Sequence, residues 1–263
     1  MNHSDNWGWK ARFGLFIVGV EAVPEAEWWA MAPEGVSVHA ARVSDSTPWA
    51  AWTDDSRTEV SLKPDTARGA HQFAQMRLDA VVSAHSSSSI VGGDGWDEAT
   101  QAALRSVVRA TTHVSTNGLD CKAALKAVEV ERPYVVFPPW FGDEVLERGR
   151  EYFTHSDVEP ADIYRSDPGM GWRELPPNAL YAKGLGFEQD VESLYRQIRE
   201  TCPTDADGVL IAGTGVRCVS IISALEADLG RAVITANQAS LWRCLRSCGI
   251  YAHIDGYGQL FEI

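Results

Sequence analysis

The sequence contains, at residues 78–89, the stretch LDAVVSAHSSSS, in which an apolar run ends in a histidine and four serines. The apolar run predicts a strand buried on both faces of a sheet, and the small polar residues predict that the chain then enters a helix. The same arrangement returns at residues 208–217, GVLIAGTGVR. Two such loops facing one another would line a pocket with backbone N–H donors. We therefore expect a pocket that holds a small carboxylate.

Strand-like and helix-like segments alternate along the chain, which is typical of a mostly parallel sheet covered by helices on both faces. The expected strands are 13–20, 36–43, 78–84, 111–116, 133–137, 158–164, 208–212, 232–236 and 251–253. The expected helices are 24–32, 66–76, 95–108, 119–129, 142–154, 187–201, 216–228 and 238–248. The sequence therefore predicts an α/β fold.

The composition argues against several classes of protein. The chain has 263 residues, of which 45% are hydrophobic and 22% charged, so it is long enough to bury a large core. Its formal net charge of -13 would repel a phosphate backbone, and we expect no nucleic-acid partner. The apolar residues 13–20 follow basic residues, but they are too few to span a bilayer and no cleavage site follows them. We expect neither a leader peptide nor a membrane partner.

The cysteines and the motifs of the sequence indicate the cellular compartment and whether a cofactor is needed. The chain has five cysteines, an odd number without a C-x-x-C pair, which argues against a disulfide framework and favours the cytoplasm. The sequence contains no G-x-G-x-x-G, no phosphate-binding G-K-[ST] loop and no cluster of metal ligands. We therefore expect neither a cofactor nor a metal.

Two segments lack a regular pattern. Residues 165–186 combine glycines and prolines with Trp172 and Tyr181, and they would form either a lid over the pocket or a plain surface connection. Residues 44–64, with Trp49 and Trp52, are expected to form a loop near the mouth of the pocket.

Three passages carry a resemblance to a known group of enzymes. They are residues 27–39, EWWAMAPEGVSVH; residues 84–87, AHSS, with the turn 91–93, VGG; and residues 213–217, GTGVR, followed by 236–242, ANQASLW. They resemble the maleate isomerase and arylmalonate decarboxylase group of the aspartate/glutamate racemase superfamily. Their order and spacing match that group over nearly the whole chain.

The resemblance implies a fold, a substrate class and an assembly. It implies two similar Rossmann-like domains with mostly parallel sheets and an active site in the cleft between them. The first domain would comprise residues 1–115 plus 226–263, and the second residues 116–225. The substrate would be a small-molecule carboxylate, and the protein would be a monomer or a homodimer.

The chain departs from the group at the residues that carry its chemistry. Members use cysteine as acid/base or nucleophile, and the two cysteine positions match His85 and Gly213 here. An asparagine that members often use to bind substrate matches Glu21. Because glycine has no side chain to carry a proton, neither two-base proton transfer nor thioether formation can run in its usual form.

His85 and Glu21 are the candidate catalytic residues. His85 lies in the loop after a strand and could move protons or activate water near neutral pH; alternatively, it only hydrogen-bonds the neighbouring serines. Glu21 follows the first expected strand, at the edge where α/β sheets collect ligands; alternatively, it is a solvated carboxylate in a loop.

The candidate substrate-binding residues come from the two loops and from side chains near them. Hydroxyl and backbone donors of the loops would hold a carboxylate or a developing oxyanion. Two aromatic residues stand where the resemblance places a carboxylate-binding tyrosine, although aromatic residues more often belong to a core. Asn237 would orient the loops or cap the next helix. The expected set is Ser86, Ser87, Gly213, Thr214, Gly215, Val216, Trp140, Phe141 and Asn237.

Three functions remain open at this point. The first is a cofactor-independent lyase or isomerase that acts on a small carboxylate, aromatic or cyclic ones included, with His85 as acid/base in place of the cysteine of the group. The second is a hydrolase or hydratase in which His85 and Glu21 activate water. The third is a carboxylate-binding protein without catalytic activity.

Overall fold

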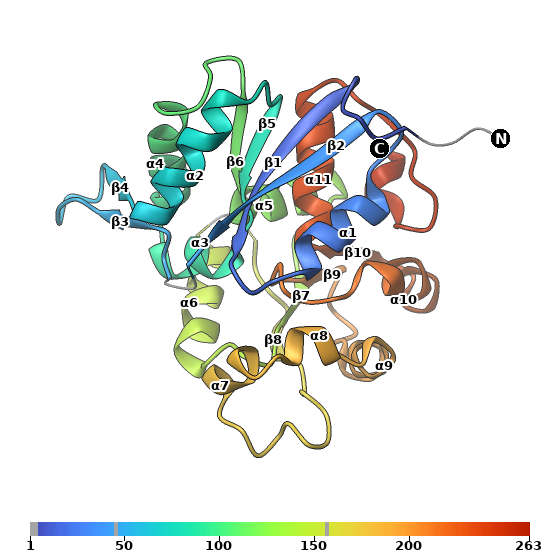
Figure 1. Ribbon diagram of the computed structural model, residues 1–263. Coiled ribbons are helices and arrows are strands. Elements are labelled where there is room, and N and C mark those ends of the chain that lie inside the picture. The colour runs from blue at the N-terminus through green and yellow to red at the C-terminus, as the bar shows by residue number, and fades with distance from the viewer. Residues whose placement is uncertain (1–4, 45–46, 156–157) are drawn as a thin grey trace.

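The computed structural model describes residues 5–44, 47–155 and 158–263, and it contains two four-stranded parallel sheets (Figure 1). The first sheet, in the order β2-β1-β5-β6, comprises β1 (Ala11–Val18), β2 (Val36–Val43), β5 (Ala80–Ser83) and β6 (His113–Thr116). The second, in the order β10-β9-β7-β8, comprises β7 (Pro133–Phe137), β8 (Asp162–Arg165), β9 (Gly208–Ile211) and β10 (Ala232–Thr235).

Strand β1 has apolar side chains on both faces because both faces of the first sheet are covered. Phe13, Leu15 and Ile17 enter one core, and Phe16 and Val18 enter the other. The first core is closed by α1 (Val23–Met31) and α11 (Ala236–Ser247), and the second by α2 (Pro64–Gln75) and α4 (Trp96–Arg105). This alternation produces the unbroken apolar run of the sequence.

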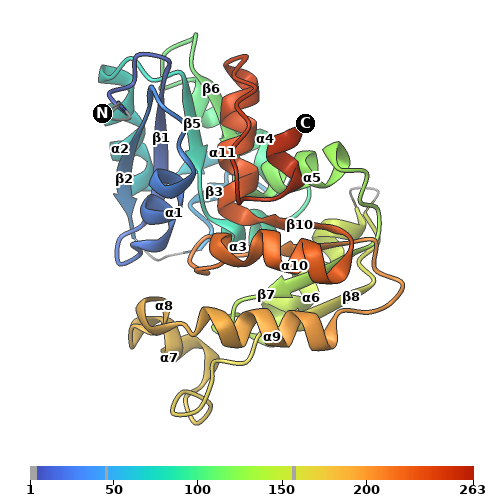
Figure 2. The ribbon, with the colours of Figure 1, turned by 90° about the vertical axis from the view of Figure 1, so that its right-hand side faces the viewer.

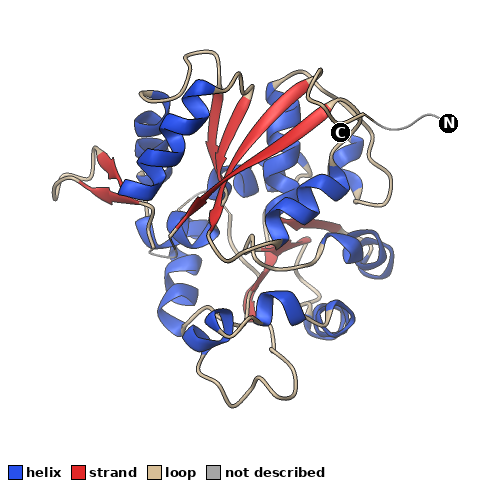
Figure 3. Ribbon diagram, in the orientation of Figure 1, coloured by secondary structure: helices blue, strands red, loops and turns tan. Residues whose placement is uncertain are grey.

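Helices also surround the second sheet, as the colouring of Figure 3 shows. They are α6 (Asp143–Thr154), α9 (Val191–Thr201) and α10 (Ile222–Leu229). Helix α5 (Asn117–Ala127) contacts both β6 and β10 and so joins the two halves. The shorter elements are α3 (Ser86–Gly92), α7 (Pro177–Ala182), α8 (Leu185–Glu188), the 3-10 turns η1 (Val219–Ile221) and η2 (Gln259–Glu262), and a hairpin of β3 (Ala50–Trp52) and β4 (Val60–Leu62).

The predicted α/β class with two parallel sheets is confirmed. Strand β8 and helix α10 begin later than expected, at Asp162 and Ile222, and three further segments differ in kind. Residues 251–253 form no strand, because Tyr251 is exposed and no neighbouring strand pairs with this segment. Residues 44–64 contain the β3–β4 hairpin, whose Ala50 and Val60 pack on Trp96. Residues 165–186 contain α7, a helix too short to leave a periodic signal in the sequence.

The expected return of residues 226–263 to the first domain is divided between the two sheets. Strand β10 pairs with β9 in the second sheet, so residues 232–235 do not belong with the first one. Helix α11 does return, since it contacts β5, β6 and α1, and Figure 2 shows it standing beside the first sheet. The chain therefore passes from the second sheet back to the first at the junction of β10 and α11. No helix within the described ranges is long and apolar enough to cross a membrane.

Candidate functional site

The loops that follow β5 and β9 meet at one cavity between the two sheets. Each follows the carboxyl end of an inner strand, which is where open α/β sheets collect ligands. Residues 85–87 and residues 213–215 both line this cavity, whose volume is about 420 Å³. The Thr214 hydroxyl joins the two loops by donating to the carbonyl of Ala84, with 3.0 Å between the oxygens.

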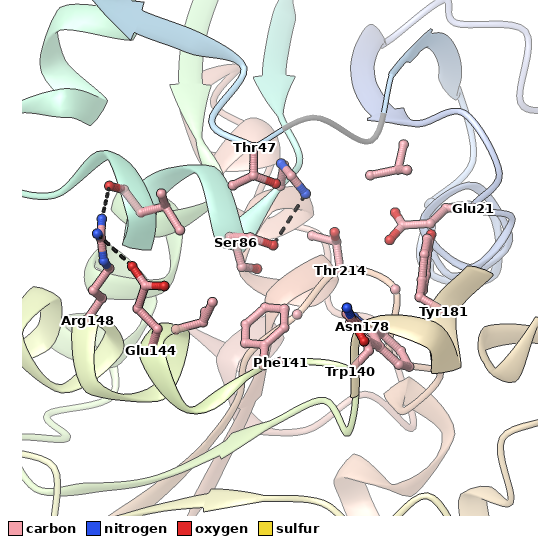
Figure 4. Close-up of a pocket in the computed structure, with 17 residues that line it drawn as sticks. Glu21, Thr47, Ser86, Trp140, Phe141, Glu144, Arg148, Asn178, Tyr181 and Thr214 are labelled. Carbon is pink, nitrogen blue, oxygen red and sulfur yellow. Dashed lines mark hydrogen bonds and ion pairs between the residues drawn. The ribbon is translucent and has the colours of Figure 1, made fainter. Parts of the chain in front are cut away.

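The remaining walls of the cavity come from both domains (Figure 4). One end is charged, because Arg148 on α6 pairs with Glu144 at 2.8 Å and donates to the carbonyl of Val91 at 3.2 Å. The opposite end contains Glu21 and Tyr181. The other lining residues include Val18, Thr47, Trp140, Phe141, Val145 and Asn178, together with the loops.

His85 is fixed in the wall of the cavity by stacking and by two hydrogen bonds. Its ring stacks on Trp49, with the ring centroids 4.2 Å apart and an interplanar angle of 18°. Its Nδ1 lies 2.8 Å from the Ser88 hydroxyl, and its Nε2 lies 3.3 Å from the Ser87 hydroxyl. Burial, with a smaller contribution from Lys63, lowers the pKa of His85 to about 3. The imidazole is therefore neutral at pH 7.

Glu21 is a buried carboxyl group without a compensating cation on its oxygens. Glu21 is 7% exposed, and its Oε2 has no hydrogen-bond partner among the described residues. Arg42 approaches it, but the guanidinium donates to the carbonyl of Glu21 at 2.6 Å and pairs with Glu25. Burial therefore outweighs the charge of Arg42 and raises the pKa of Glu21 to about 8. At pH 7 this side chain carries its proton.

Backbone amides supply most of the free donors of the cavity. In the described part of the chain, the N–H groups of Ser86, Ser87, Thr214 and Gly215 have no acceptor. The hydroxyl of Ser86 donates away from the cavity, to Asn117 Oδ1 at 2.6 Å, as that of Thr214 does to its own partner. Of the expected hydroxyl donors, Ser87 is therefore the one that does not donate to another part of the protein. The backbone amides are the groups that could hold an oxyanion.

Comparisons with known proteins agree with this architecture. A family model described as arylmalonate decarboxylase matches residues 181–261, and a search of curated proteins gave no match. Maleate isomerase from Pseudomonas putida S16 superposes with a TM-score of 0.77 at 21% sequence identity, covering 95% of this chain and 98% of the isomerase. Arylmalonate decarboxylase superposes with a TM-score of 0.72 at 20% sequence identity, covering 95% of this chain and 99% of the decarboxylase. Maleate cis-trans isomerase from Nocardia farcinica superposes with a TM-score of 0.73 at 15% sequence identity, covering 95% of this chain and 97% of the isomerase.

The chain has the fold of these enzymes. The resemblance expected from the sequence, to the maleate isomerase and arylmalonate decarboxylase group, is therefore confirmed, and so are its two Rossmann-like domains. At the two positions where that resemblance implies cysteines, the structure has a neutral imidazole and a glycine.

Gly213 is in a backbone conformation that does not suit a thiol. Its φ of +117° lies in a region that residues with a side chain rarely adopt. A Cβ built there would meet the ring of Pro138 at 3.0 Å. The three most buried cysteines, Cys121, Cys218 and Cys244, do not line the cavity, and burial raises the pKa of each thiol. No described thiol is therefore placed to act in the cavity.

Asn237 and Val216, both expected to bind substrate, do not line the cavity. Asn237 donates to the carbonyl of Thr214 at 2.9 Å and to Glu27 Oε2 at 2.7 Å, and Thr235 caps the helix instead. Glu27 in turn accepts the N–H groups of Cys218 at 2.6 Å and Val219 at 3.0 Å. Both side chains are buried and hold the loop in place.

Several residues of the site lie outside the expected set. Trp49 comes from a segment expected only to lie near the pocket mouth, and Ser88 is one of four similar serines. Glu27 lies in a loop-and-helix region with two other glutamates, and burial raises its pKa to about 7. No sequence signal separates it from its neighbours. No group of three or more metal-ligating side chains occurs among the residues that the structure describes.

Proposed function

We propose that the protein is a cofactor-independent lyase or isomerase that acts on a small carboxylate. The observation that carries the proposal is one cavity in which two loops present unpartnered amide donors beside two buried titratable side chains, His85 and Glu21. Hydrogen-bond donors aimed at the place where negative charge develops make the largest single contribution to the rate enhancement of many enzymes. The related maleate isomerase has been solved with maleate, and a variant of arylmalonate decarboxylase with sulfate, which supports an anion in the cavity.

Loss of carbon dioxide is the reaction that this cavity fits best. When the bond between the α-carbon and one carboxylate breaks, the electron pair is delocalised into the remaining carboxyl or acyl group as an enediolate or enolate. The amides of residues 86–87 and 214–215 can stabilise that oxygen, and Phe141 and Val145 add apolar side chains to the wall. A proton then has to reach the α-carbon. That step falls to His85 or Glu21, the buried titratable side chains in the wall.

Cis–trans isomerisation through a thioether is a weaker candidate, because it needs a thiol in the cavity. The hydrolase alternative needs His85 to accept a proton from water, and its neutral, deeply buried imidazole is a weak base. A binding protein without catalytic activity would keep the amides but would have no use for a protonated carboxyl at the end of the cavity.

The test combines a panel of small carboxylates with a cavity-filling variant. Gly215→Ala places a methyl group where a Cβ would meet Glu21 Oε1 at 2.6 Å and Trp140 at 3.2 Å. Gly142→Ala is the matched control, because a Cβ there meets nothing within 4 Å. We expect carboxylates to bind the natural protein and the control alike in calorimetry, and at least about tenfold more weakly to Gly215→Ala.

Turnover is measured on malonic and other α-substituted carboxylic acids by NMR, with carbon dioxide release as the readout. The proposal fails if no carboxylate binds, or if Gly215→Ala binds as well as Gly142→Ala. Binding without turnover of any carboxylate would instead support the binding protein.

A further inference from the structure

We propose that the two side chains have separate roles: Glu21 delivers the proton to the α-carbon, and His85 is a fixed, neutral hydrogen-bond donor to the developing oxyanion. This inference rests on the proposed function. It reverses the expectation that His85 is the acid/base, and it follows from hydrogen bonds on the side of the imidazole that faces away from the cavity.

The hydroxyl of Ser88 sets the tautomer of His85. Ser88 Oγ is fully buried and accepts the backbone N–H of Trp49 at 3.0 Å. Its own proton needs an acceptor, and the one within reach among the described residues is His85 Nδ1 at 2.8 Å. Because Nδ1 accepts, the neutral ring must carry its proton on Nε2. Nε2–H is then directed at the Ser87 hydroxyl, 3.3 Å away in the cavity wall, and this long contact is one that an oxyanion in the cavity can replace.

The surroundings of His85 also oppose a second proton on the ring. Trp49 covers one face, and the charged group that influences it, Lys63, is positive. No carboxylate lies within ion-pair distance of the imidazole among the described residues. A ring that stays neutral can donate through Nε2 throughout the reaction, but it cannot supply a proton and remain ready for the next turnover.

Glu21 has the opposite properties. Its carboxyl lies against Gly215, so it occupies the side of the cavity formed by the second loop, where Gly213 leaves no side chain. The charged groups around it are Arg42 on β2, which binds the carbonyl of Glu21, and Glu25 on α1, which pairs with Arg42. Tyr181 on α7 adds a hydroxyl that has no partner among the described residues. Among these groups Arg42 alone favours an ionised Glu21, and burial outweighs its charge.

A second cavity gives Glu21 a route to solvent. It has a volume of about 280 Å³ and shares Glu21, Asn178, Tyr181 and Gly215 with the first cavity. Its other walls include Val20 and Phe187, which are 60% and 63% exposed. A carboxyl in the wall between a substrate cavity and a solvent-facing one can give its proton to one side and recover a proton from the other.

The chemistry balances with these two groups. The bond between the α-carbon and the departing carboxylate breaks, carbon dioxide leaves, and the electron pair enters the enediolate that His85 Nε2–H and the loop amides bind. The O–H bond of Glu21 then breaks as its proton joins the α-carbon, and Glu21 becomes a carboxylate. Water in the second cavity returns the proton, so each turnover consumes one proton from solvent.

NMR measures both protonation states without a substrate. In protein labelled at the glutamate carboxyl carbon, a signal that is absent from Glu21→Gln should titrate well above the usual range of a carboxyl group. In protein labelled at the histidine nitrogens, His85 should show a proton on Nε2 and none on Nδ1, without titration between pH 5 and 8. A Glu21 that is ionised at pH 6, or a His85 protonated on Nδ1, overturns the inference whichever reaction the protein performs.

Matched variants separate a donor from a base in the reaction. His85→Gln keeps an N–H near the position of Nε2, whereas His85→Phe keeps the stacking on Trp49 but has no donor. If His85 donates, kcat should fall about 10²- to 10³-fold in His85→Phe and by at least tenfold less in His85→Gln. Glu21→Gln should lower kcat about 10²- to 10⁴-fold with little change in carboxylate binding. Equal activity of the two His85 variants, or an active Glu21→Gln, overturns the inference and leaves the proposed function standing; absence of carboxylate binding overturns both.

Discussion

Glu21→Gln should make the protein more stable, and the gain should depend on pH. The pKa of Glu21 is raised from 4.5 to about 8 in the folded chain because burial penalises the charged form. A folded-state pKa above the unfolded value means that the folded chain holds a proton which the unfolded chain releases. The contribution of Glu21 to stability is therefore fully present below pH 4.5 and is lost as the pH rises towards 8.

The size of the effect follows from that difference in pKa. Each unit is worth about 1.4 kcal/mol, so the natural protein should lose about 3 to 4 kcal/mol of unfolding free energy through Glu21 between pH 5 and pH 8. Glutamine keeps the shape without the titration. The variant should therefore exceed the natural protein by about 4 kcal/mol at pH 8 and by less than about 1 kcal/mol at pH 5.

Urea denaturation at pH 5, 6, 7 and 8 measures the difference. Burial also raises the pKa of Glu27 and Asp120, each to about 7, but these groups are present in both proteins and their effect cancels. Glu144→Gln is the matched control, because it makes the same substitution at an exposed carboxylate at the other end of the cavity and should not reproduce the gain in stability. Parallel curves for the natural protein and Glu21→Gln would refute the reasoning, because they would mean that Glu21 ionises as easily in the fold as outside it.

Three further substitutions test the geometry of the site. Asn237→Ala removes the donor to Glu27 and to the carbonyl of Thr214. It should lower the free energy of unfolding by about 2 to 4 kcal/mol in urea denaturation and weaken carboxylate binding. Equal carboxylate affinity of the variant and the natural protein in calorimetry would contradict the positioning role. Gly213→Cys should not create a reactive thiol and should destabilise the fold by about 1 to 3 kcal/mol, so fast thiol titration in a stable variant would argue against the strained loop. Trp49→Ala removes the ring that stacks on His85, and it should cost about 3 to 5 kcal/mol; retention of a single His85 tautomer by nitrogen NMR in that variant would show that Ser88 alone orients the ring.

The sequence located most of the cavity because its loops follow the ends of strands. The loops that contain His85 and Gly213 were expected to face one another, and nine of the eleven candidate residues line the cavity. The exceptions, Val216 and Asn237, come directly after residues of the cavity or lie in a neighbouring helix. Proximity along the chain does not say whether a side chain points into a cavity or behind its wall.

The sequence could not reveal how the charges of the site behave. The pKa of Glu21 and of His85 depends on how much water each group loses, and that depends on α1, α7 and the β3–β4 hairpin packing around them. Glu27 and Asn237 lie 210 positions apart and meet only because α11 crosses back to the first sheet. No local pattern encodes such a contact.

The sequence by itself determined the alternation of strands and helices, the two loops at the strand ends and the absence of side-chain chemistry at Gly213. It could do so because apolar periodicity and residue identity are local properties. The tertiary structure alone decided that His85 holds its proton on Nε2 and that Glu21 stays protonated against Gly215. Those states depend on hydrogen bonds to Ser88 and on burial, which exist only after distant segments have packed together.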